Sequence, residues 1–230
     1  MEKKNGKKLT VLFDFDNTIT TFDIIDDMLE RFSKDDKWKK LEEKWQREEI
    51  GSKECLKGQI EGIKVDKPRL DKYLSGVKID PYFKKLITFL RSRNIPVLIV
   101  SDNFDYMLKK ILRKNGIKDI EVYCNKAEMA GDRLKPSFPF SNDECGSCAN
   151  CKKAYVDRIR KRGRSAVYIG DGRSDVCASK ASDIVFAKGY LQELFKKEGL
   201  PHVAIDGLKD VYDYFKSRGR RPRHLADTVA

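Results

Sequence analysis

Short apolar runs recur along the chain and mark the strands of the predicted fold. They cover residues 9–15, 95–101, 120–125, 165–171 and 183–188. Nearly every central residue of these runs is apolar, as expected for strands that are covered on both faces. The pattern therefore predicts a parallel sheet.

Helical patterns lie between these runs. Residues 81–94, 104–114 and 154–162 repeat apolar side chains at helical spacing. Strands that alternate with helices build an open sheet whose ligands bind at the carboxyl ends of the strands. We therefore predict an α/β fold with a doubly wound, mostly parallel sheet.

Two segments interrupt the alternation. Residues 22–78 are helical in pattern, with candidate helices in DIIDDMLERF, WKKLEEKWQREE and KECLKGQIEGI, and we expect them to form a helical cap inserted after the first strand. The α/β core would then comprise residues 1–21 and 79–217. Residues 126–150 contain AGDRLKP and a cysteine run, and are predicted to be a loop or hairpin flap.

Composition narrows the class of protein. Charged residues make up 37% of the 230 residues and hydrophobic ones 40%, as in a soluble globular protein. No apolar run approaches the roughly 20 residues of a membrane span, and no apolar signal region follows MEKKNGKK. We therefore expect a cytoplasmic protein without a membrane partner.

The net charge of +12 raises the question of an anionic partner. Basic residues are interleaved with glutamates, except in the cluster 216–224, which overlaps a basic tail, residues 218–230, predicted to be disordered or peripheral. Neither clustered aromatic residues nor a recognisable binding module accompanies the charge, so we do not expect a nucleic-acid partner.

Candidate chemistry begins in VLFDFDNTIT, residues 11–20. Asp14 and Asp16 arrive at the end of the first predicted strand. Two carboxylates at close range repel each other unless a positive charge lies between them, which a metal ion would supply. A single aspartate here could instead cap a following helix.

Three further segments favour the metal. VSD (residues 100–102) ends the second strand with a hydroxyl, CKK (151–153) opens a helix with lysines, and GDGRSD (170–175) ends a later strand with two carboxylates. Together they supply a nucleophile, oxygen ligands for a hard divalent cation, and groups that can hold a phosphoryl group.

In this order the four segments resemble the motifs of the haloacid dehalogenase-like phosphatases, over residues 9 to about 186. The resemblance implies that Asp14 attacks phosphorus and forms an aspartyl-phosphate. It implies that Asp16 protonates the leaving oxygen and then activates water. A small phosphorylated metabolite would be the substrate, and the protein would be a monomer or homodimer.

The same resemblance implies a Mg²⁺ site and a phosphoryl site. Mg²⁺ would be held by Asp14, the backbone carbonyl of Asp16 and Asp171, with Asp175 in support. Ser101 and Lys152 would bind phosphoryl oxygens, and Asp102 is a further predicted substrate-binding residue. Lys152 is favoured over Lys153 because relatives usually place the lysine just before the helix proper. Alternatively, both are solvated lysines at a helix start.

The leaving group stays open. The helical insertion resembles the phosphoserine phosphatase-like subgroup. Within it, VYCN, the cysteine run ending in CK, and AKGYL resemble the methionine-salvage phosphatases, which act on an enol phosphate, whereas SDN (101–103) resembles the phosphoethanolamine/phosphocholine phosphatases. Asp23 stands where phosphoserine phosphatases carry a substrate-contacting acid, but could equally cap a helix. A nucleic-acid-binding or catalytically silent relative is the alternative of another class.

The cysteine run CGSCANC contains Cys145, Cys148 and Cys151. In a cytosolic protein this spacing suggests metal binding or redox chemistry more than a disulfide framework. The three thiolates could hold zinc, with Cys124 as a fourth ligand. Alternatively they are free or redox-active thiols.

Overall fold

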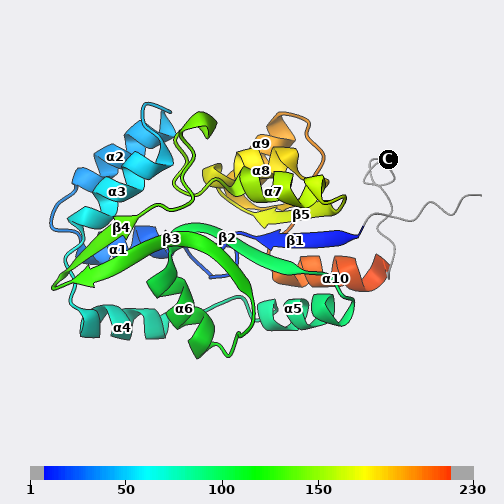
Figure 1. The fold of residues 1–230 in the computed structure, drawn as a ribbon, viewed down its shortest axis with the longest axis horizontal. Helices are drawn as coiled ribbons and strands as arrows, with labels where there is room; N and C mark the ends of the chain where they lie inside the picture. Colours follow the sequence, from blue (N-terminus) through cyan, green and yellow to red (C-terminus); the bar gives the residue numbers. More distant parts are fainter. Residues whose placement is uncertain (1–7, 219–230) are drawn as a thin grey trace, which may run out of the picture. The chain divides into compact units, whose positions relative to one another are not determined.

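Seven strands form a mostly parallel sheet in the computed structural model, which describes residues 8–218 (Figure 1). Their order is β4-β3-β2-β1-β5-β6-β7. The strands are β1 (Leu9–Phe13), β2 (Val97–Phe104), β3 (Glu121–Ala130), β4 (Arg133–Ser137), β5 (Ser165–Gly170), β6 (Ile184–Ala187) and β7 (Val203–Ala204). The strand order runs in opposite directions on the two sides of β1, so the predicted doubly wound α/β fold is confirmed.

The described chain divides into two compact units. The first contains the residues up to 14, residues 80–98 and the residues from 152 onward. The second contains Phe15–Ile79 and Ile99–Cys151.

The first unit carries the parallel part of the sheet. β1 pairs with β5 in parallel, from Leu9 opposite Ser165 to Phe13 opposite Ile169, and β6 and β7 continue the parallel pairing. All five residues of β1 are buried, as its mostly apolar sequence predicted. Figure 1 shows helices on both faces of these strands. They are α5 (Phe83–Ser92), α7 (Lys152–Lys161), α8 (Val176–Ala181), α9 (Gly189–Lys197) and α10 (Leu208–Arg218), with the short η2 (Arg173–Asp175) before α8.

The second unit holds most of β2, the hairpin of β3 and β4, and the helices of the predicted cap segment. Its helices are α1 (Ile24–Phe32), α2 (Lys37–Gln46), α3 (Ser52–Gly62), α4 (Lys67–Gly76) and α6 (Asp105–Lys114), with the short η1 (Asp143–Cys145). Residues 22–78 thus form helices and none of the seven strands, as predicted. However, α4 is a fourth helix that was not among the three predicted. It was missed because it buries few apolar side chains, Leu70 and Leu74. Its start was nevertheless signalled by Asp66, whose carboxylate accepts the backbone N–H of Arg69.

The segment predicted to be a loop or hairpin is in part a hairpin. β3 extends beyond the predicted strand to Ala130, and pairs antiparallel with β4 from Lys126 opposite Ser137 to Ala130 opposite Arg133. Gly131 opens the two-residue turn with a φ of +66°, which a glycine adopts without strain. This extension was missed because it alternates buried and exposed positions instead of forming an apolar run.

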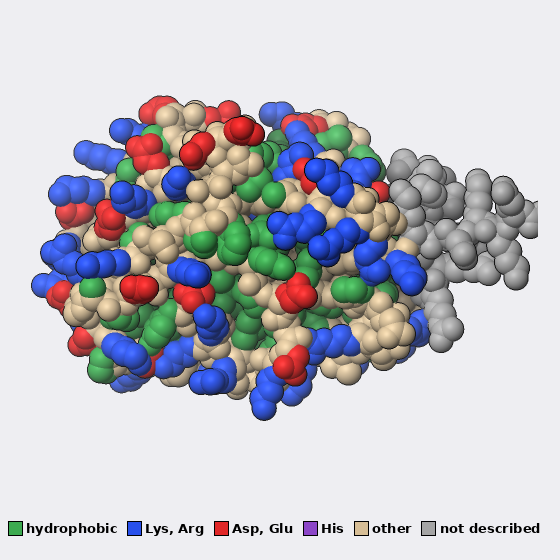
Figure 2. All heavy atoms as spheres, viewed as in Figure 1, with side chains coloured by type: hydrophobic (Ala, Val, Ile, Leu, Met, Phe, Trp, Pro, Cys, Tyr) green, Lys and Arg blue, Asp and Glu red, His purple; other side chains and the backbone are tan. Residues whose placement is uncertain are grey.

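Two further properties of the described residues concern membrane spans and surface charge. No described helix combines the length and the apolar character needed to span a membrane. Figure 2 shows lysine and arginine side chains across the viewed face with acidic side chains among them, as the interleaved sequence predicted. The predicted basic tail lies outside the described residues, apart from Arg218 at the end of α10.

Candidate active site

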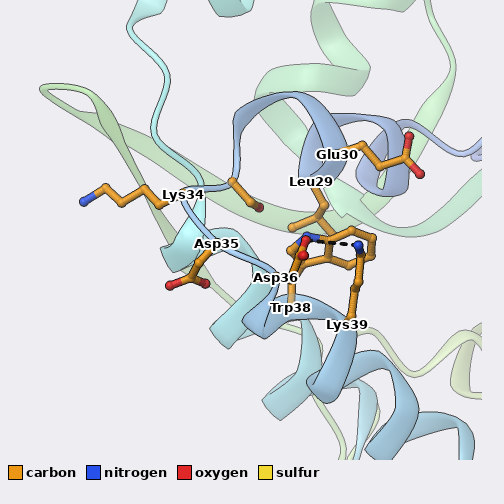
Figure 3. Close-up of a pocket in the computed structure, with 8 residues that line it drawn as sticks. Leu29, Glu30, Lys34, Asp35, Asp36, Trp38 and Lys39 are labelled. Carbon is orange, nitrogen blue, oxygen red and sulfur yellow. Dashed lines mark ion pairs between the residues drawn. The ribbon is translucent and has the colours of Figure 1, made fainter.

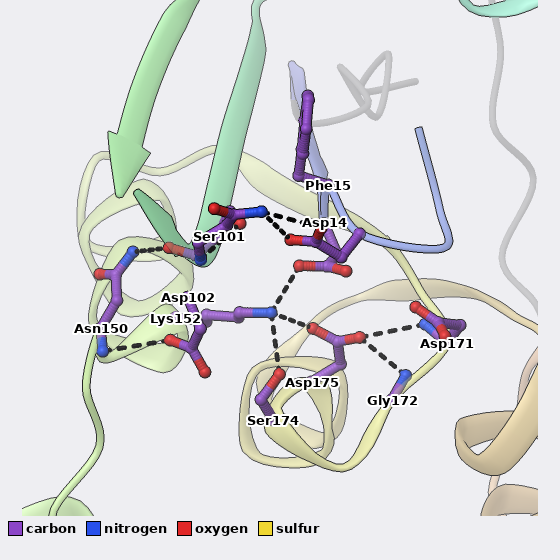
Figure 4. A network of polar contacts seen from close by, with 12 residues as sticks. Asp14, Phe15, Ser101, Asp102, Asn150, Lys152, Asp171, Gly172, Ser174 and Asp175 are labelled. Atoms are coloured by element: carbon purple, nitrogen blue, oxygen red, sulfur yellow. Dashed lines mark hydrogen bonds and ion pairs between the residues drawn. The ribbon is translucent and has the colours of Figure 1, made fainter. Parts of the chain in front are cut away.

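The centre of the candidate site is the buried ammonium group of Lys152, the first residue of α7 (Figure 4). Its Nζ lies 2.6 Å from Oδ1 of Asp14 and 2.7 Å from Oδ1 of Asp175, and donates to Oγ of Ser174 at 3.0 Å. The Lys152 side chain is only 2% exposed. A buried ammonium requires such ionised partners, because burying it alone is very costly. All four residues belong to the first unit.

Asp175 organises the loop after β5. Besides Lys152, its Oδ1 accepts the hydroxyl of Tyr168 at 2.7 Å, and its Oδ2 accepts the backbone N–H groups of Asp171 and Gly172, both at 3.0 Å. Burial and then the nearby Asp175 carboxylate raise the pKa of Tyr168 well above its usual value, so the phenol remains a donor. These four hydrogen bonds fix the Asp175 carboxylate and the loop around it.

Gly170 is required by this arrangement. A Cβ atom at this position would lie 2.6 Å from Oδ2 of Asp175 and 2.9 Å from a ring carbon of Tyr168. The glycine in GDGRSD therefore lets the backbone approach the buried carboxylate.

Three carboxylates form a candidate metal cluster. One oxygen each from Asp14, Asp171 and Asp175 lies within 4.8 Å of the others. All-oxygen donors suit a hard divalent cation such as Mg²⁺. Because Asp175 already accepts four donors from the protein, it fits the supporting role that was predicted for it, and Asp14 and Asp171 fit the direct ligand positions.

Asp16 lies in the second unit and is held from two directions. Its Oδ1 accepts the backbone N–H of Ile24, the first residue of α1, at 3.1 Å. The side-chain amide of Asn103 donates to both carboxylate oxygens, at 2.9 and 3.0 Å. A helix N-terminus and amide donors both favour the ionised carboxylate. Asn103, which is 1% exposed, was not predicted as a site residue.

Ser101 and Asp102 lie in the second half of β2 and are hydrogen-bonded to the segment before α7. The hydroxyl of Ser101 accepts the backbone N–H of Asn103 at 3.0 Å, and its carbonyl accepts the side-chain amide of Asn150 at 2.8 Å. The backbone N–H of Asn150 donates to Oδ1 of Asp102 at 3.2 Å, and Asn125 donates to the Asp102 carbonyl at 2.6 Å. Asp102 thus links β2 to Asn125 and Asn150 within the second unit. The sequence did not indicate these contacts.

The structure bears on two alternatives left open by the sequence, the choice between Lys152 and Lys153 and the role of Asp23. Lys153 forms an ion pair at 2.6 Å with Asp157, and its side chain is 43% exposed, so Lys152 is the buried lysine of the pair. Asp23 is the N-cap of α1, with its carboxylate accepting the backbone N–H of Asp26 at 3.0 Å. The capping alternative for Asp23 is therefore observed.

The cysteines of the run lie together. One sulfur each from Cys145, Cys148 and Cys151 lies within 4.8 Å of the others, whereas Cys124 is a buried thiol of β3 outside this group. Burial and then the neighbouring thiols raise the pKa of Cys148 to about 12.

A surface hollow in the second unit is distinct from the predicted residues. Figure 3 shows it where α1 ends and α2 begins, next to an ion pair at 3.0 Å between Asp36 and Lys39. It is lined by Leu29, Glu30, Ser33, Lys34, Asp35, Asp36, Trp38 and Lys39. None of these is a predicted site residue, so the hollow has no part in the candidate chemistry.

The chain is similar to known proteins along most of its length. A family model described as "Putative Phosphatase" matches residues 9–200. The chain is 28% identical to a 2-hydroxy-3-keto-5-methylthiopentenyl-1-phosphate phosphatase from Brevibacillus brevis, over 90% of this chain and 94% of that protein. It is 29% identical to a protein of the same name from Bacillus pumilus, over 91% of each chain.

Solved structures show the same fold. A substrate-bound phosphoserine phosphatase complex matches with a TM-score of 0.68 and 20% identity, covering 93% of this chain and all of the other. A phospho-aspartyl intermediate analogue of phosphoserine phosphatase gives the same TM-score and identity, covering 92% of this chain. The fold implied by the sequence resemblance is therefore confirmed.

The neighbouring lysines provide a matched test of the buried network. Lys152→Met should lower the free energy of unfolding by about 3–5 kcal/mol, because it leaves two carboxylates buried without their counter-ion. Lys153→Met should change it by less than about 0.5 kcal/mol, because its ion pair is exposed. Urea denaturation measures both. Equal effects of the two substitutions would contradict the assignment.

Proposed function

We propose that the chain, which belongs to the family described as "Putative Phosphatase", hydrolyses a small phosphomonoester through an aspartyl-phosphate on Asp14. The observation that carries the proposal is the buried ammonium of Lys152 between Asp14 and Asp175, beside the carboxylate of Asp171. This arrangement pairs a nucleophilic carboxylate with the charges that a phosphoryl group and a divalent cation require.

Each step uses a residue of this chain. A carboxylate oxygen of Asp14 attacks phosphorus, and the bond to the leaving oxygen breaks while Asp16 gives that oxygen a proton. Asp16 then removes a proton from water, the water oxygen attacks phosphorus, and the bond from phosphorus to Asp14 breaks. Phosphate is released and both aspartates return to their initial states.

Lys152 and Ser101 are the proposed phosphoryl-binding residues. Lys152 also keeps Asp14 ionised and oriented, as its 2.6 Å contact supports. Asp14, Asp171 and the backbone carbonyl of Asp16 would hold Mg²⁺, with Asp175 in support. When bound, Mg²⁺ supplies positive charge that offsets the repulsion between the phosphoryl group and the attacking carboxylate.

The substrate that we propose is the enol phosphate named for the relatives, 2-hydroxy-3-keto-5-methylthiopentenyl-1-phosphate. Support comes from relatives that align over nearly the whole of both chains. Phosphoserine or phosphoethanolamine is the second candidate, because an acidic residue at position 23 suits an amine-bearing substrate. The expected setting is the cytoplasm.

Hydrolysis of an aryl phosphate tests the reaction class. We expect Mg²⁺-dependent turnover that EDTA abolishes and added Mg²⁺ restores. Asp14→Asn should lower kcat by at least about 1,000-fold, because it removes the nucleophile. Asp157→Asn, which changes an exposed partner of Lys153, is the control. Turnover that survives both EDTA and Asp14→Asn would disprove the proposal.

A panel of phosphates tests the leaving group. The enol phosphate, phosphoserine and phosphoethanolamine should be compared by kcat/KM in the wild type and in Asp23→Asn. Asparagine keeps an acceptor for the α1 cap while removing the charge, so a structural effect of the substitution is minimised. We expect the enol phosphate to be preferred and little changed. A selective loss on amine-bearing substrates, together with their preference in the wild type, would favour the second candidate.

Asn103 should be a positioning residue for Asp16. Without its amide the carboxylate loses two hydrogen bonds, so Asp16 should keep its proton to higher pH. The basic limb of kcat/KM should therefore move to higher pH in Asn103→Ala, and kcat should fall by up to about 100-fold. Asn115→Ala, which removes a contact to a carbonyl of α6, is the control. An unchanged pH profile would show that Asn103 does not act through Asp16.

A further inference from the structure

The thiols of Cys145, Cys148 and Cys151 form a cluster that the phosphatase chemistry does not use. One sulfur atom from each lies within 4.8 Å of the others. In a tetrahedral zinc site with Zn–S bonds of about 2.3 Å, the sulfur atoms are separated by roughly 3.8 Å. The three thiols are therefore close to the spacing that zinc requires.

The backbone between them brings the thiols together. Gly146 and Ser147 have φ angles of +69° and +55°, so the chain turns sharply between Cys145 and Cys148. Asn142 and Cys148 exchange two backbone hydrogen bonds, each 3.1 Å long, which close the loop. A left-handed conformation at Ser147 is unfavourable for a residue with a side chain. The loop thus maintains a costly conformation in which the thiols of Cys145 and Cys148 lie close to that of Cys151.

Contacts to α3 hold this loop in place. The buried hydroxyl of Ser52 accepts the backbone N–H of Ala149 at 2.9 Å, and the backbone N–H of Lys53 donates to the carbonyl of Ser147 at 3.1 Å. The loop approaches Gly51 so closely that a Cβ atom there would lie 2.3 Å from Cβ of Ser147. The positions of the sulfur atoms are therefore organised in advance.

A polar contact to one sulfur also fits a thiolate. The side-chain amide of Asn142 lies 3.6 Å from Sγ of Cys151, and N–H donors of this kind stabilise metal-bound thiolates. Cys151 itself is buried, with 5% exposure. A buried sulfur atom with an amide donor is the environment of a metal ligand more than that of a surface thiol.

We propose that Cys145, Cys148 and Cys151 bind one zinc ion as three thiolates, with the fourth position taken by water or another small ligand. A disulfide would join only two of these thiols and would leave the third unexplained, whereas zinc uses all three. Binding releases three protons from the thiols and leaves a net charge of −1 on the zinc and its sulfur ligands. Cys124 is not required, which revises the four-cysteine arrangement considered from the sequence.

The zinc ion has a structural role in this proposal. It links the two ends of the segment 145–151, whose last residue directly precedes Lys152 in the sequence. Zinc would therefore restrain the backbone that enters α7. This role is independent of Mg²⁺ and of the reaction at Asp14, so failure of either proposal leaves the other standing.

Metal content and cobalt spectroscopy of the full chain test the proposal. Purified under reducing conditions, the chain should hold about one zinc ion after dialysis against Mg²⁺. Replacement by Co²⁺ should give thiolate-to-cobalt charge-transfer absorption with the intensity of three thiolates. Cys148→Ser should weaken zinc binding at least about 10-fold. Cys177→Ser, which changes an exposed thiol outside the cluster, should leave zinc binding unchanged.

Two outcomes would overturn the proposal. Absence of zinc from the reduced wild type, with no charge-transfer absorption on adding Co²⁺, would leave the cluster as free thiols or a disulfide. A weaker cobalt band in Cys124→Ser than in the wild type would show a fourth thiolate and refute the open position. If Cys148→Ser does not fold, alkylation of the zinc-loaded wild type still decides, because three thiols should be protected until a chelator is added.

Discussion

The ion pairs of Lys152 are the constraint on which the candidate site depends. An ammonium group that is almost fully buried is tolerable only if ionised partners meet it at short range, and both Asp14 and Asp175 do so. The three residues are far apart in the sequence but follow or precede elements that meet at the carboxyl edge of β1 and β5. The parallel pairing of these two strands therefore brings the ammonium group to its two carboxylate partners. With one positive and three negative groups, the cluster keeps the negative charge that a divalent cation can neutralise.

The roles proposed for the three carboxylates follow from the hydrogen-bond donors that Asp175 accepts. Asp175 accepts two backbone N–H groups, a phenol and an ammonium, which use its oxygens to fix the loop after β5. In the proposed mechanism, attack and metal binding are therefore assigned to Asp14 and Asp171. Gly170 is needed for the same reason. A larger residue at this position would displace the Asp175 carboxylate, which holds the loop.

The sequence predicted those features that depend on local pattern. β1 and β5 were predicted because strands that are buried on both faces are mostly apolar, and Asp14 and Asp171 became candidate site residues because each directly follows such a strand. β4 and the two-residue β7 carry no comparable signal. Asn103 could not be assigned because its partner, Asp16, is 87 residues away in the sequence. Lys152 and Lys153 are adjacent in the sequence, and α7 directs their side chains differently. The structure distinguishes them by burial, because the Lys152 side chain is buried and the Lys153 side chain is exposed.

The start of α1 joins the proposed acid and base to the segment that follows it. Asp16 accepts the N–H of Ile24, the first residue of α1, and the preceding residue, Asp23, caps the same helix through the N–H of Asp26. Two N–H groups at the helix N-terminus thus donate to carboxylates, one proposed for catalysis and one, in the second candidate function, for substrate contact. A change at position 23 that removes the cap would loosen the helix turn that orients Asp16, and would alter turnover of every substrate. Specificity can therefore vary at this position only among residues that still cap a helix, which restricts the choice to short polar side chains.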